Sequence, residues 1–278
     1  MTAPLFGAVA APDLHVMTLN VRRRMPRLLG RPADSWRIRR ARVRTLLRGE
    51  HPALLGVQEA LPDQADTIGT ALGAEYRRIG HGRQRGPRGE ACPMFFDAAR
   101  LELVDWTQTA LSDEPDRPGS ASWGNLIPRV LVRAVLRDRA TDATFAAFNT
   151  HLDVFSGRAR VRGAEEIRRQ VVDLRLPAVV MGDLNAGPDS PAVAGLLRDG
   201  VLVDAWRAAG ERVTAEWGTY GGYREPRRER DRIDWIVVTP DVDVRSAGIN
   251  AQRMLGGWPS DHLAVQTVLR VPRMESLP

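Results

Sequence analysis

The chain has no lysine. All 40 of its basic residues are arginine, and against 34 acidic residues they give a formal net charge of +6. Such a balance normally indicates nucleic-acid binding. Here the abundance of Arg, Ala, Gly and Pro is typical of a GC-rich coding sequence, so the charge is weak support for any one partner. It would help to attract a phosphorylated substrate without identifying it.

Cysteine is almost absent, and long apolar runs are absent. Cys92 is the only cysteine, which excludes an intramolecular disulfide and a Cys/His zinc cluster. No run approaches the 18 apolar residues of a membrane span, and residues 1–12 lack the basic start and apolar stretch of a signal peptide. We therefore expect a cytoplasmic monomer with no membrane contact and no obligate protein partner.

What is present predicts a large α/β fold. The 278 residues are 43% hydrophobic, enough for one domain over 1–278 with a core at about 14–271. Apolar runs that alternate with amphipathic stretches favour a mixed sheet with helices. The expected strands are 14–20, 53–59, 93–97, 101–106, 128–136, 143–151, a run from 179, 233–238 and 263–271, and the expected helices are 35–48, 62–72, 157–174 and 191–198.

The stretch from Val179 to Ser190 carries the most specific local pattern. An apolar strand ends in Gly-Asp-Leu-Asn, and a Gly-Pro turn follows. Asp183 and Asn185 are two residues apart, so in an extended chain they face the same side. A carboxylate beside a carboxamide suits a hard metal ion or an activated water. Taken alone, a simple turn explains these residues equally well, because Asp, Asn, Gly and Pro are common turn formers.

The same pattern recurs at other strand ends. Ligand sites of α/β proteins gather at such ends. Each case has a structural alternative. Glu59 could cap the next helix, and His151 could be a core or turn histidine. Asp234 could form an ion pair with Arg232 or Arg230. Five such ends in one chain favour a functional site. They carry Asn20, Glu59, Asn149 with His151, Asp183 with Asn185, and Asp261 with His262.

Six motifs carry a resemblance to a known family. They are Leu19-Asn20-Val-Arg, Val57-Gln-Glu59, Phe148-Asn-Thr-His151-Leu, Gly182-Asp-Leu-Asn185, Arg232-Ile-Asp234-Trp-Ile and Pro259-Ser-Asp-His262. In this order and spacing they resemble the endonuclease/exonuclease/phosphatase superfamily over residues 14–270. A further set of residues resembles its bacterial metal-dependent hydrolases near the deadenylase/nocturnin-like group: Trp36, Gly80-His-Gly-Arg, Gly89-Glu, Leu111-Ser-Asp-Glu-Pro, Trp123, Pro128-Arg and Gly218-Thr-Tyr. The resemblance implies a DNase I-like four-layer α/β sandwich, in which two mixed sheets pack face to face with helices outside.

The resemblance also implies a metal site. Glu59 would be the principal ligand of Mg²⁺, with Mn²⁺ as a possible substitute, because both ions prefer oxygen ligands. Asn20 would support the metal or contact the phosphate, and Asp261 would lie close by. Whether one metal acts or two stays open.

Catalytic roles follow from the same resemblance. Asp183 would orient or deprotonate the attacking water, and Asn185 would bind the scissile phosphate or a second metal. Asp234 would hold one nitrogen of His262, which then acts as a base or as electrostatic support. His151 would donate to phosphate oxygens and protonate the leaving oxygen.

A second set of residues is expected to shape the substrate pocket. Its members match the bacterial branch, and loop charge or core packing explains each of them equally well. They are Arg83, Glu90, Trp123, Arg129 and Tyr220, with Tyr223 as a further aromatic candidate.

The expected function is a Mg²⁺-dependent phosphoesterase that acts on a nucleotide, a sugar phosphate or another small phosphorylated molecule. The alternative is a DNA or RNA nuclease, although Val-Arg-Arg after Asn20 departs from the abasic-endonuclease pattern. A non-catalytic phosphate-binding protein is the remote alternative. Such a protein is expected to have lost one of four residues that are all present, Glu59, Asp183, Asp234 and His262. Endonuclease, exonuclease and phosphatase action stay open.

Overall fold

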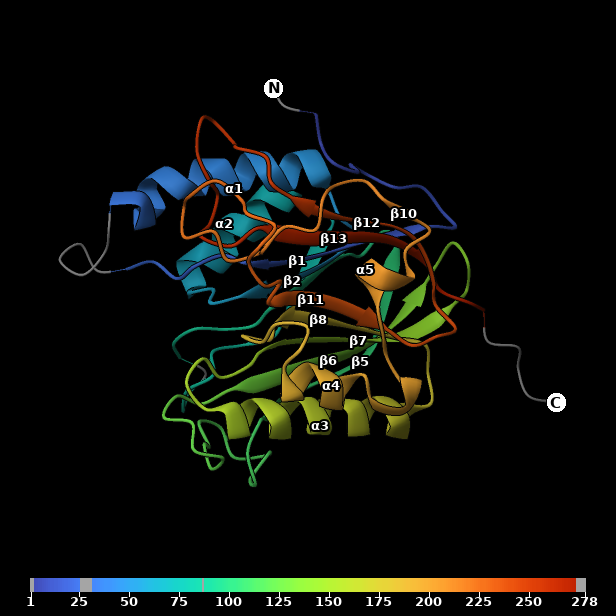
Figure 1. Ribbon diagram of the computed structural model, residues 1–278. Helices are drawn as coiled ribbons and strands as arrows, with labels where there is room; N and C mark the ends of the chain where they lie inside the picture. Colours follow the sequence, from blue (N-terminus) through green and yellow to red (C-terminus); the bar gives the residue numbers. More distant parts are fainter. Residues whose placement is uncertain (1–2, 26–31, 87, 274–278) are drawn as a thin grey trace.

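Two β-sheets packed face to face form the centre of the molecule, and helices cover both outer faces (Figure 1). The structure is a computed structural model that describes residues 3–25, 32–86 and 88–273. The four layers, from helices through two sheets to helices, confirm the predicted DNase I-like α/β sandwich.

The first sheet is mixed and seven-stranded. Its centre is β1, which pairs in parallel with β2 and antiparallel with β13. In spatial order its strands are β10 (Glu211–Arg212), β12 (Asp243–Asn250), β13 (Ala264–Arg270), β1 (Leu14–Asn20), β2 (Leu54–Gln58), β4 (Met94–Asp97) and β3 (Tyr76–Ile79).

The second sheet is mixed and six-stranded. Here β8 pairs in parallel with β7 and antiparallel with β11. Its spatial order is β5 (Leu101–Ala110), β6 (Val130–Asp138), β7 (Thr144–His151), β8 (Ala178–Asp183), β11 (Asp234–Val238) and β9 (Val203–Asp204).

The helices lie on the outer faces. In Figure 1, α1 (Trp36–Glu50) and α2 (Pro62–Leu72) cover the first sheet, and α3 (Gly157–Leu174) and α4 (Pro191–Leu196) cover the second. Ser156 caps α3 by accepting the Ala159 N–H, whereas Ser35 occupies the cap position of α1 without a side-chain bond. The short elements are η1 (Pro32–Asp34), η2 (Arg198–Gly200) and α5 (Ala205–Ala208).

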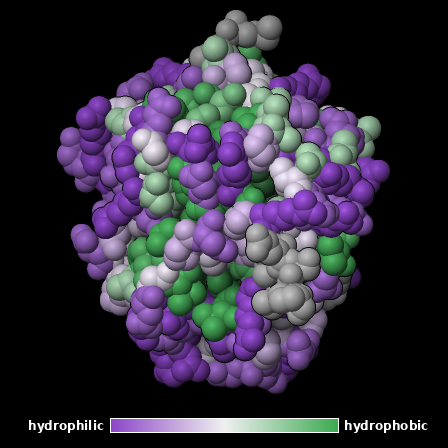
Figure 2. Space-filling view, turned by 90° about the vertical axis from the view of Figure 1, so that its right-hand side faces the viewer, coloured by the Kyte–Doolittle hydropathy of each residue, from purple (hydrophilic) through white to green (hydrophobic). Residues whose placement is uncertain are grey.

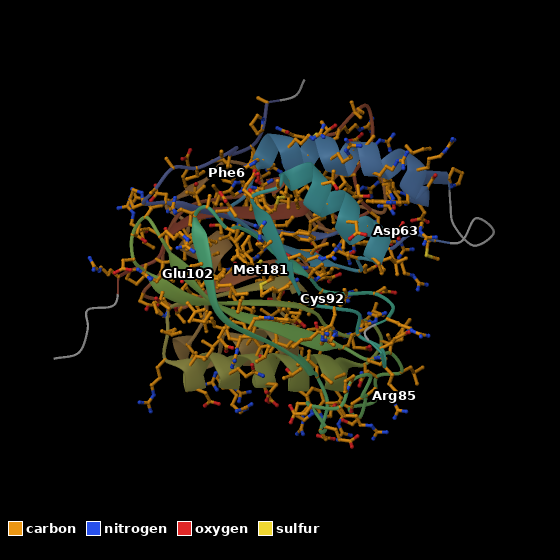
Figure 3. All side chains as sticks on the ribbon, turned by 180° about the vertical axis from the view of Figure 1, so that it is seen from behind. Phe6, Asp63, Arg85, Cys92, Glu102 and Met181 are labelled. Carbon is orange, nitrogen blue, oxygen red and sulfur yellow. The ribbon has the colours of Figure 1, made fainter. Side chains whose placement is uncertain are left out.

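The central strands, such as β1, β2, β8 and β11, are buried on both faces, which explains their continuous apolar runs. Along β8, Val179 and Met181 point into the core between the sheets, while Ala178 and Val180 pack under α3. Figure 3 shows Met181 and Cys92 in this central layer. Burial raises the pKa of the Cys92 thiol to about 12.

Several strands escape prediction from the sequence. The strand β12 starts as Asp-Val-Arg, with an exposed, charged first half and a bulge between Val244 and Ser246. Of the four residues of β3, two are exposed arginines, and β5 continues beyond 106 to Ala110 through exposed residues. In all three, half-exposed residues interrupt the apolar pattern that marks the other strands.

At one end of the sandwich, called the polar end below, polar strand ends of both sheets meet. The polar end lies where β11 and β13 begin and β1 and β8 finish, on the left of Figure 1. Figure 2 shows the opposite end, where hydrophilic residues surround apolar patches. Among the described residues, none of the helices combines the length and apolarity needed to cross a membrane.

Candidate active site

A cavity of about 640 Å³ opens at the polar end of the sandwich. It exists because the core between the sheets becomes polar toward this end: in β8, Asp183 continues the inward-facing series of Val179 and Met181. Of the predicted metal and catalytic residues, Glu59, His151, Asp183, Asn185, Asp261 and His262 line this cavity.

Three of the polar side chains lie side by side in the second sheet. His151 on β7 is the register partner of Asp183 on β8, which is also the partner of Asp234 on β11. In-register side chains share one face of a sheet, so these three point together into the space between the sheets. Gly182 makes the close packing possible, because a Cβ at its φ of +148° would lie 2.1 Å from the Thr150 carbonyl oxygen.

Asn20 joins the two sheets. Its side-chain amide donates to Glu59 Oε1 at 3.0 Å and to Asp183 Oδ2 at 2.9 Å. Its Oδ1 accepts the backbone N–H of Arg22 at 2.9 Å. The fully buried amide is therefore an organiser that fixes two carboxylates of different sheets relative to each other.

Glu59 follows β2 in a left-handed conformation, with φ of 61°. Burial opposes its ionisation, but the His151 and His262 rings, the Arg23 N–H and the Asn20 amide lower the pKa of Glu59 to about 2. Its carboxylate is thus charged at neutral pH. The structural alternative for Glu59 is wrong, since Leu61 is the N-cap residue of α2 and the Gln64 side chain completes the cap.

A guanidinium group lies between two carboxylates at this edge of the cavity. Arg22 Nη1 is 3.9 Å from Glu59 Oε2, and Arg22 Nε is 3.5 Å from Asp261 Oδ2. Burial raises the pKa of Asp261. The loop that carries Asp261 is tied to β1, because Ser260 Oγ donates to the Asn20 carbonyl at 2.6 Å. This edge therefore already favours a positive charge.

Asp183 and Asn185 reach the cavity by a turn, and the expectation of an extended chain over both is wrong. The strand ends at Asp183, and Asn185 has a φ of 49°. The Asn185 N–H donates to Asp183 Oδ1 at 2.9 Å, and its side chain donates to the Leu152 carbonyl at 3.0 Å. The motif therefore forms a turn, and this turn places both side chains at the cavity.

His262 and Asp234 form a buried pair. The His262 Nδ1–H donates to Asp234 Oδ2 at 2.8 Å, and Arg232 instead pairs with Asp204, so the structural ion pair considered for Asp234 is wrong. Burial alone would lower the pKa of His262, but Asp234 and Asp183 raise it well above the ordinary value. Burial and the charge of Asp234 raise the pKa of Asp183.

The same group can hold a metal ion. One potential ligand atom from each of Asp183, Asp234 and His262 lies within 4.8 Å of the others. The Oδ1 atom of Asp234 is buried without a hydrogen-bond partner among the described residues. Buried carboxylate oxygens of this kind are suited to a cation or to a protonated histidine.

His151 has the opposite character to His262. Its Nε2 lies 3.5 Å from Asp183 Oδ2, while its buried Nδ1 has no partner among the described residues. Burial lowers the pKa of His151 to about 4, with Asp183 acting against this shift. At neutral pH the ring is uncharged and keeps one N–H to donate.

Four of the five predicted substrate-binding residues line the cavity. Arg83 and Glu90 form a buried ion pair at 2.8 Å, and Arg129 pairs with Asp153 at 3.2 Å. The ring of Tyr220 packs 5.1 Å from that of His262. These buried pairs and this packing hold the walls of the cavity in place.

Trp123 does not line the cavity, contrary to expectation. It is buried in the core under α3, and its Nε1–H donates to Asp113 Oδ1 at 2.7 Å. Tyr223 is also structural, because its hydroxyl donates to Asp34 Oδ1 at 3.0 Å. Asn149 lies deeper than the cavity, where its amide donates to three backbone carbonyls, among them that of Cys92.

Arg22 and Arg39 were not predicted from the sequence as residues of the site. Arg22 appears there only as part of a motif, yet it lines the cavity. Arg39 is fully buried in α1 and donates to the carbonyls of Val21 (2.7 Å), Arg22 (2.9 Å), Pro259 (3.2 Å) and Asp34 (3.3 Å). A signal exists: Arg39 lies on the helical stripe of Trp36 and Val43, which faces the core.

The sequence and the fold are similar to those of known proteins. A model of the endonuclease/exonuclease/phosphatase family matches residues 17–262. An endonuclease/exonuclease/phosphatase from Bacteroides vulgatus is 30% identical, and the match covers 94% of this chain and 99% of that one, with a TM-score of 0.86. A mannosyl-6-phosphatase from Bacteroides thetaiotaomicron is 26% identical over 92% and 99%, with a TM-score of 0.86.

The catalytic domain of human nocturnin is more distant. It is 19% identical, over 98% of this chain and 100% of that one, with a TM-score of 0.74. At this identity the likeness shows the fold alone. No curated protein matches the chain significantly.

Proposed function

Because this chain belongs to the endonuclease/exonuclease/phosphatase family, and is therefore a phosphoric ester hydrolase, we propose that it hydrolyses a small phosphorylated molecule with the help of Mg²⁺. The observation that carries the proposal is that three register partners of the second sheet meet Asn20 and Glu59 of the first sheet. The three partners are His151, Asp183 and Asp234. Phosphate ester hydrolysis needs a cation, an activated water and donors to the phosphoryl oxygens.

The carboxylates at the Arg22 edge fit a hard cation. Glu59 and Asp261 would hold it, with Asn20 fixing Glu59 in position. Oxygen donors and a Glu59 carboxylate that stays charged match Mg²⁺, or Mn²⁺ as a substitute. A bound ion would offset phosphate charge and polarise the bond to be broken. Arg22 supports this assignment, since it already brings positive charge to both carboxylates.

Asp183 is the proposed group that accepts a proton from the attacking water. Its raised pKa brings it closer to the working pH than an ordinary aspartate, which favours proton transfer. The hydrogen bond from Asn20 holds Asp183 Oδ2, and Asn185 holds its Oδ1, so the carboxylate has a fixed direction. Asn185, on the same turn, would bind the phosphate.

The two histidines would donate to the substrate in different states. His262 is held protonated by Asp234 and offers the charge of its Nε2–H to a phosphoryl oxygen. His151 is neutral and offers an uncharged N–H nearby, where it would assist the leaving oxygen. The negative charge that develops on the phosphate and leaving oxygens would therefore lie next to one positive donor, His262, and one neutral donor, His151.

The size of the cavity supports a small substrate. Its volume of about 640 Å³ is within the range of about 300–1,000 Å³ typical of small-molecule sites. The mannosyl-6-phosphatase at 26% identity is named for a small phosphate ester, which agrees with this size. Buried ion pairs also neutralise Arg83 and Arg129 on the cavity wall, which leaves fewer free cations for a polynucleotide backbone.

The test is a hydrolysis screen of the whole chain with Mg²⁺ and with a chelator, in which phosphate release is measured for monoesters and strand cleavage for RNA and abasic DNA. Sugar phosphates, nucleotides, RNA and abasic DNA are the substrates, and Glu59→Gln and His262→Ala are the controls. We expect chelator-sensitive turnover of small esters that both substitutions abolish. Cleavage confined to polynucleotides would replace the small-molecule assignment with the nuclease alternative. Turnover undiminished in either variant would refute the mechanism.

A further inference from the structure

The mouth of the cavity carries an apolar side that the proposed chemistry does not use. Phe155 is 76% exposed and Val154 is 47% exposed, and both line the cavity together with Ile127. A single exposed apolar side chain is ordinary on a protein surface. Here the exposed side chains line the same cavity as Asp183 and His262.

The turn that carries Phe155 is held firmly. Asp153 is 1% exposed, and its Oδ1 accepts the N–H groups of Phe155 at 2.9 Å and Ser156 at 2.7 Å. Its Oδ2 accepts from Arg129 Nε at 3.2 Å. Arg160 adds donations to the Asp153 and Val154 carbonyls at 2.9 and 3.1 Å. An exposed ring is therefore presented from a fixed backbone.

Phe155 also differs from the other aromatic side chain of the cavity. The ring of Tyr220 packs against His262, so part of its surface is already in use. Phe155 makes no ring contact of this kind with any described residue. Phe155 follows His151 by four positions in the sequence, and His151 is the register partner of Asp183.

We propose that Phe155 stacks against a planar aromatic ring of the substrate, and that the substrate class is a phosphate ester of a nucleoside or another ring-bearing alcohol. This inference rests on the proposed phosphoesterase function and narrows it. A preorganised aromatic side chain gains binding energy from a flat apolar partner at little cost in conformational entropy. A sugar phosphate without such a ring leaves the exposed face of Phe155 in water.

The test compares adenosine 5′-monophosphate with ribose 5-phosphate. Both carry the same 5′-phosphate ester, and the adenine ring is the main difference between them. If the screen finds turnover of diesters alone, the methyl diesters of the same two compounds replace them. We expect kcat/KM to be about tenfold higher for the compound with the base, chiefly through a lower KM, as for one base–aromatic stack.

Variants assign that preference to Phe155. Phe155→Ala should lower kcat/KM for the adenine compound about tenfold and change that for ribose 5-phosphate less than twofold. Phe155→Trp keeps a ring and should retain the preference. Val104→Ala removes an exposed apolar side chain on β5, outside the cavity lining, and is the control that should leave both substrates unchanged.

Two results would overturn the inference while the phosphoesterase function stands. One is Glu59-dependent turnover with no preference for the adenine compound. The other is a preference that Phe155→Ala leaves intact, or an equal loss for both substrates. If the wild-type chain turns over none of the phosphate esters in the screen, the proposed function itself has failed.

Discussion

Glu59 and Asp183 accept hydrogen bonds from the same amide, that of Asn20, and yet the pKa values of their carboxyl groups are shifted in opposite directions. On the side of the first sheet, neighbouring donors and histidines lower the pKa of Glu59 to about 2 despite its burial. On the side of the second sheet, deep burial and the charge of Asp234 raise the pKa of Asp183. One amide thus joins a carboxylate suited to holding a cation to another suited to accepting a proton.

The largest effect on activity is expected from Asp183→Asn. The amide keeps the size of the side chain but cannot accept the proton of the water, so kcat should fall about 10³-fold. The metal concentration for half-maximal residual activity should change little. Stopped or continuous phosphate-release assays measure both quantities. A loss of less than tenfold would remove Asp183 from the proton-transfer role, and Asp243→Asn on the exposed start of β12 is the control.

Glu59→Gln should act on the cation instead. Loss of a charged ligand should raise the Mg²⁺ concentration for half-maximal binding about 100-fold. Even residues that only hydrogen-bond to metal ligands contribute about 10–100-fold to metal affinity. Titration calorimetry with Mg²⁺ measures this without turnover. The matched control is Glu90→Gln, which removes another carboxylate of the cavity but one paired with Arg83. Equal Mg²⁺ binding by the wild type and Glu59→Gln would contradict the assignment.

Without metal, the two carboxylates should affect folding stability with opposite signs. The lowered pKa of Glu59 stabilises the fold above about pH 4.3, and this contribution is lost as the pH falls toward 2. The raised pKa of Asp183 destabilises the fold increasingly as the pH rises above about 3.9. Denaturant unfolding at pH 7 with a chelator should therefore show Asp183→Asn more stable by about 1 kcal/mol and Glu59→Gln less stable. Shifts of the same sign would refute the contrast.

The smallest effect is expected from Asn20→Ala. Removal of the shared donor weakens the ionised form of both carboxyl groups, so both pKa values should rise. The acidic limb of the pH–kcat profile should move upward by less than about one pH unit. A shift in the other direction would show that Asn20 does not couple the two sheets.

Much of the fold can be predicted from the sequence because strands buried on both faces leave continuous apolar runs. The polar ends of these runs also indicate where a site forms, and the six motifs name its family. The half-exposed strands β3 and β12 lack that signal, since two exposed arginines interrupt β3 and a bulge interrupts β12. Asn149 shows a further limit: at a strand end by sequence, it lies below the cavity, where its partners belong to β2 and to the segment before β4.

Arg39 and Phe155 show why the rest of the site is harder to predict. The position of Arg39 on a core-facing stripe marks it as unusual, but three of its four carbonyl partners come from segments that meet it only in the fold. Phe155 in the sequence is one more apolar residue between a strand and a helix. Its exposure at the cavity mouth depends on the buried carboxylate of Asp153, which no local pattern reveals.

The burial of Cys92 has a practical consequence for spectroscopy. With its thiol pKa raised to about 12 and its side chain inside the central layer, the native cysteine should remain silent toward maleimide and disulfide reagents at neutral pH. A cysteine introduced at an exposed position such as Leu126 would then be the sole labelled site. Fluorescent or spin probes can therefore be attached near the cavity of the otherwise unaltered chain.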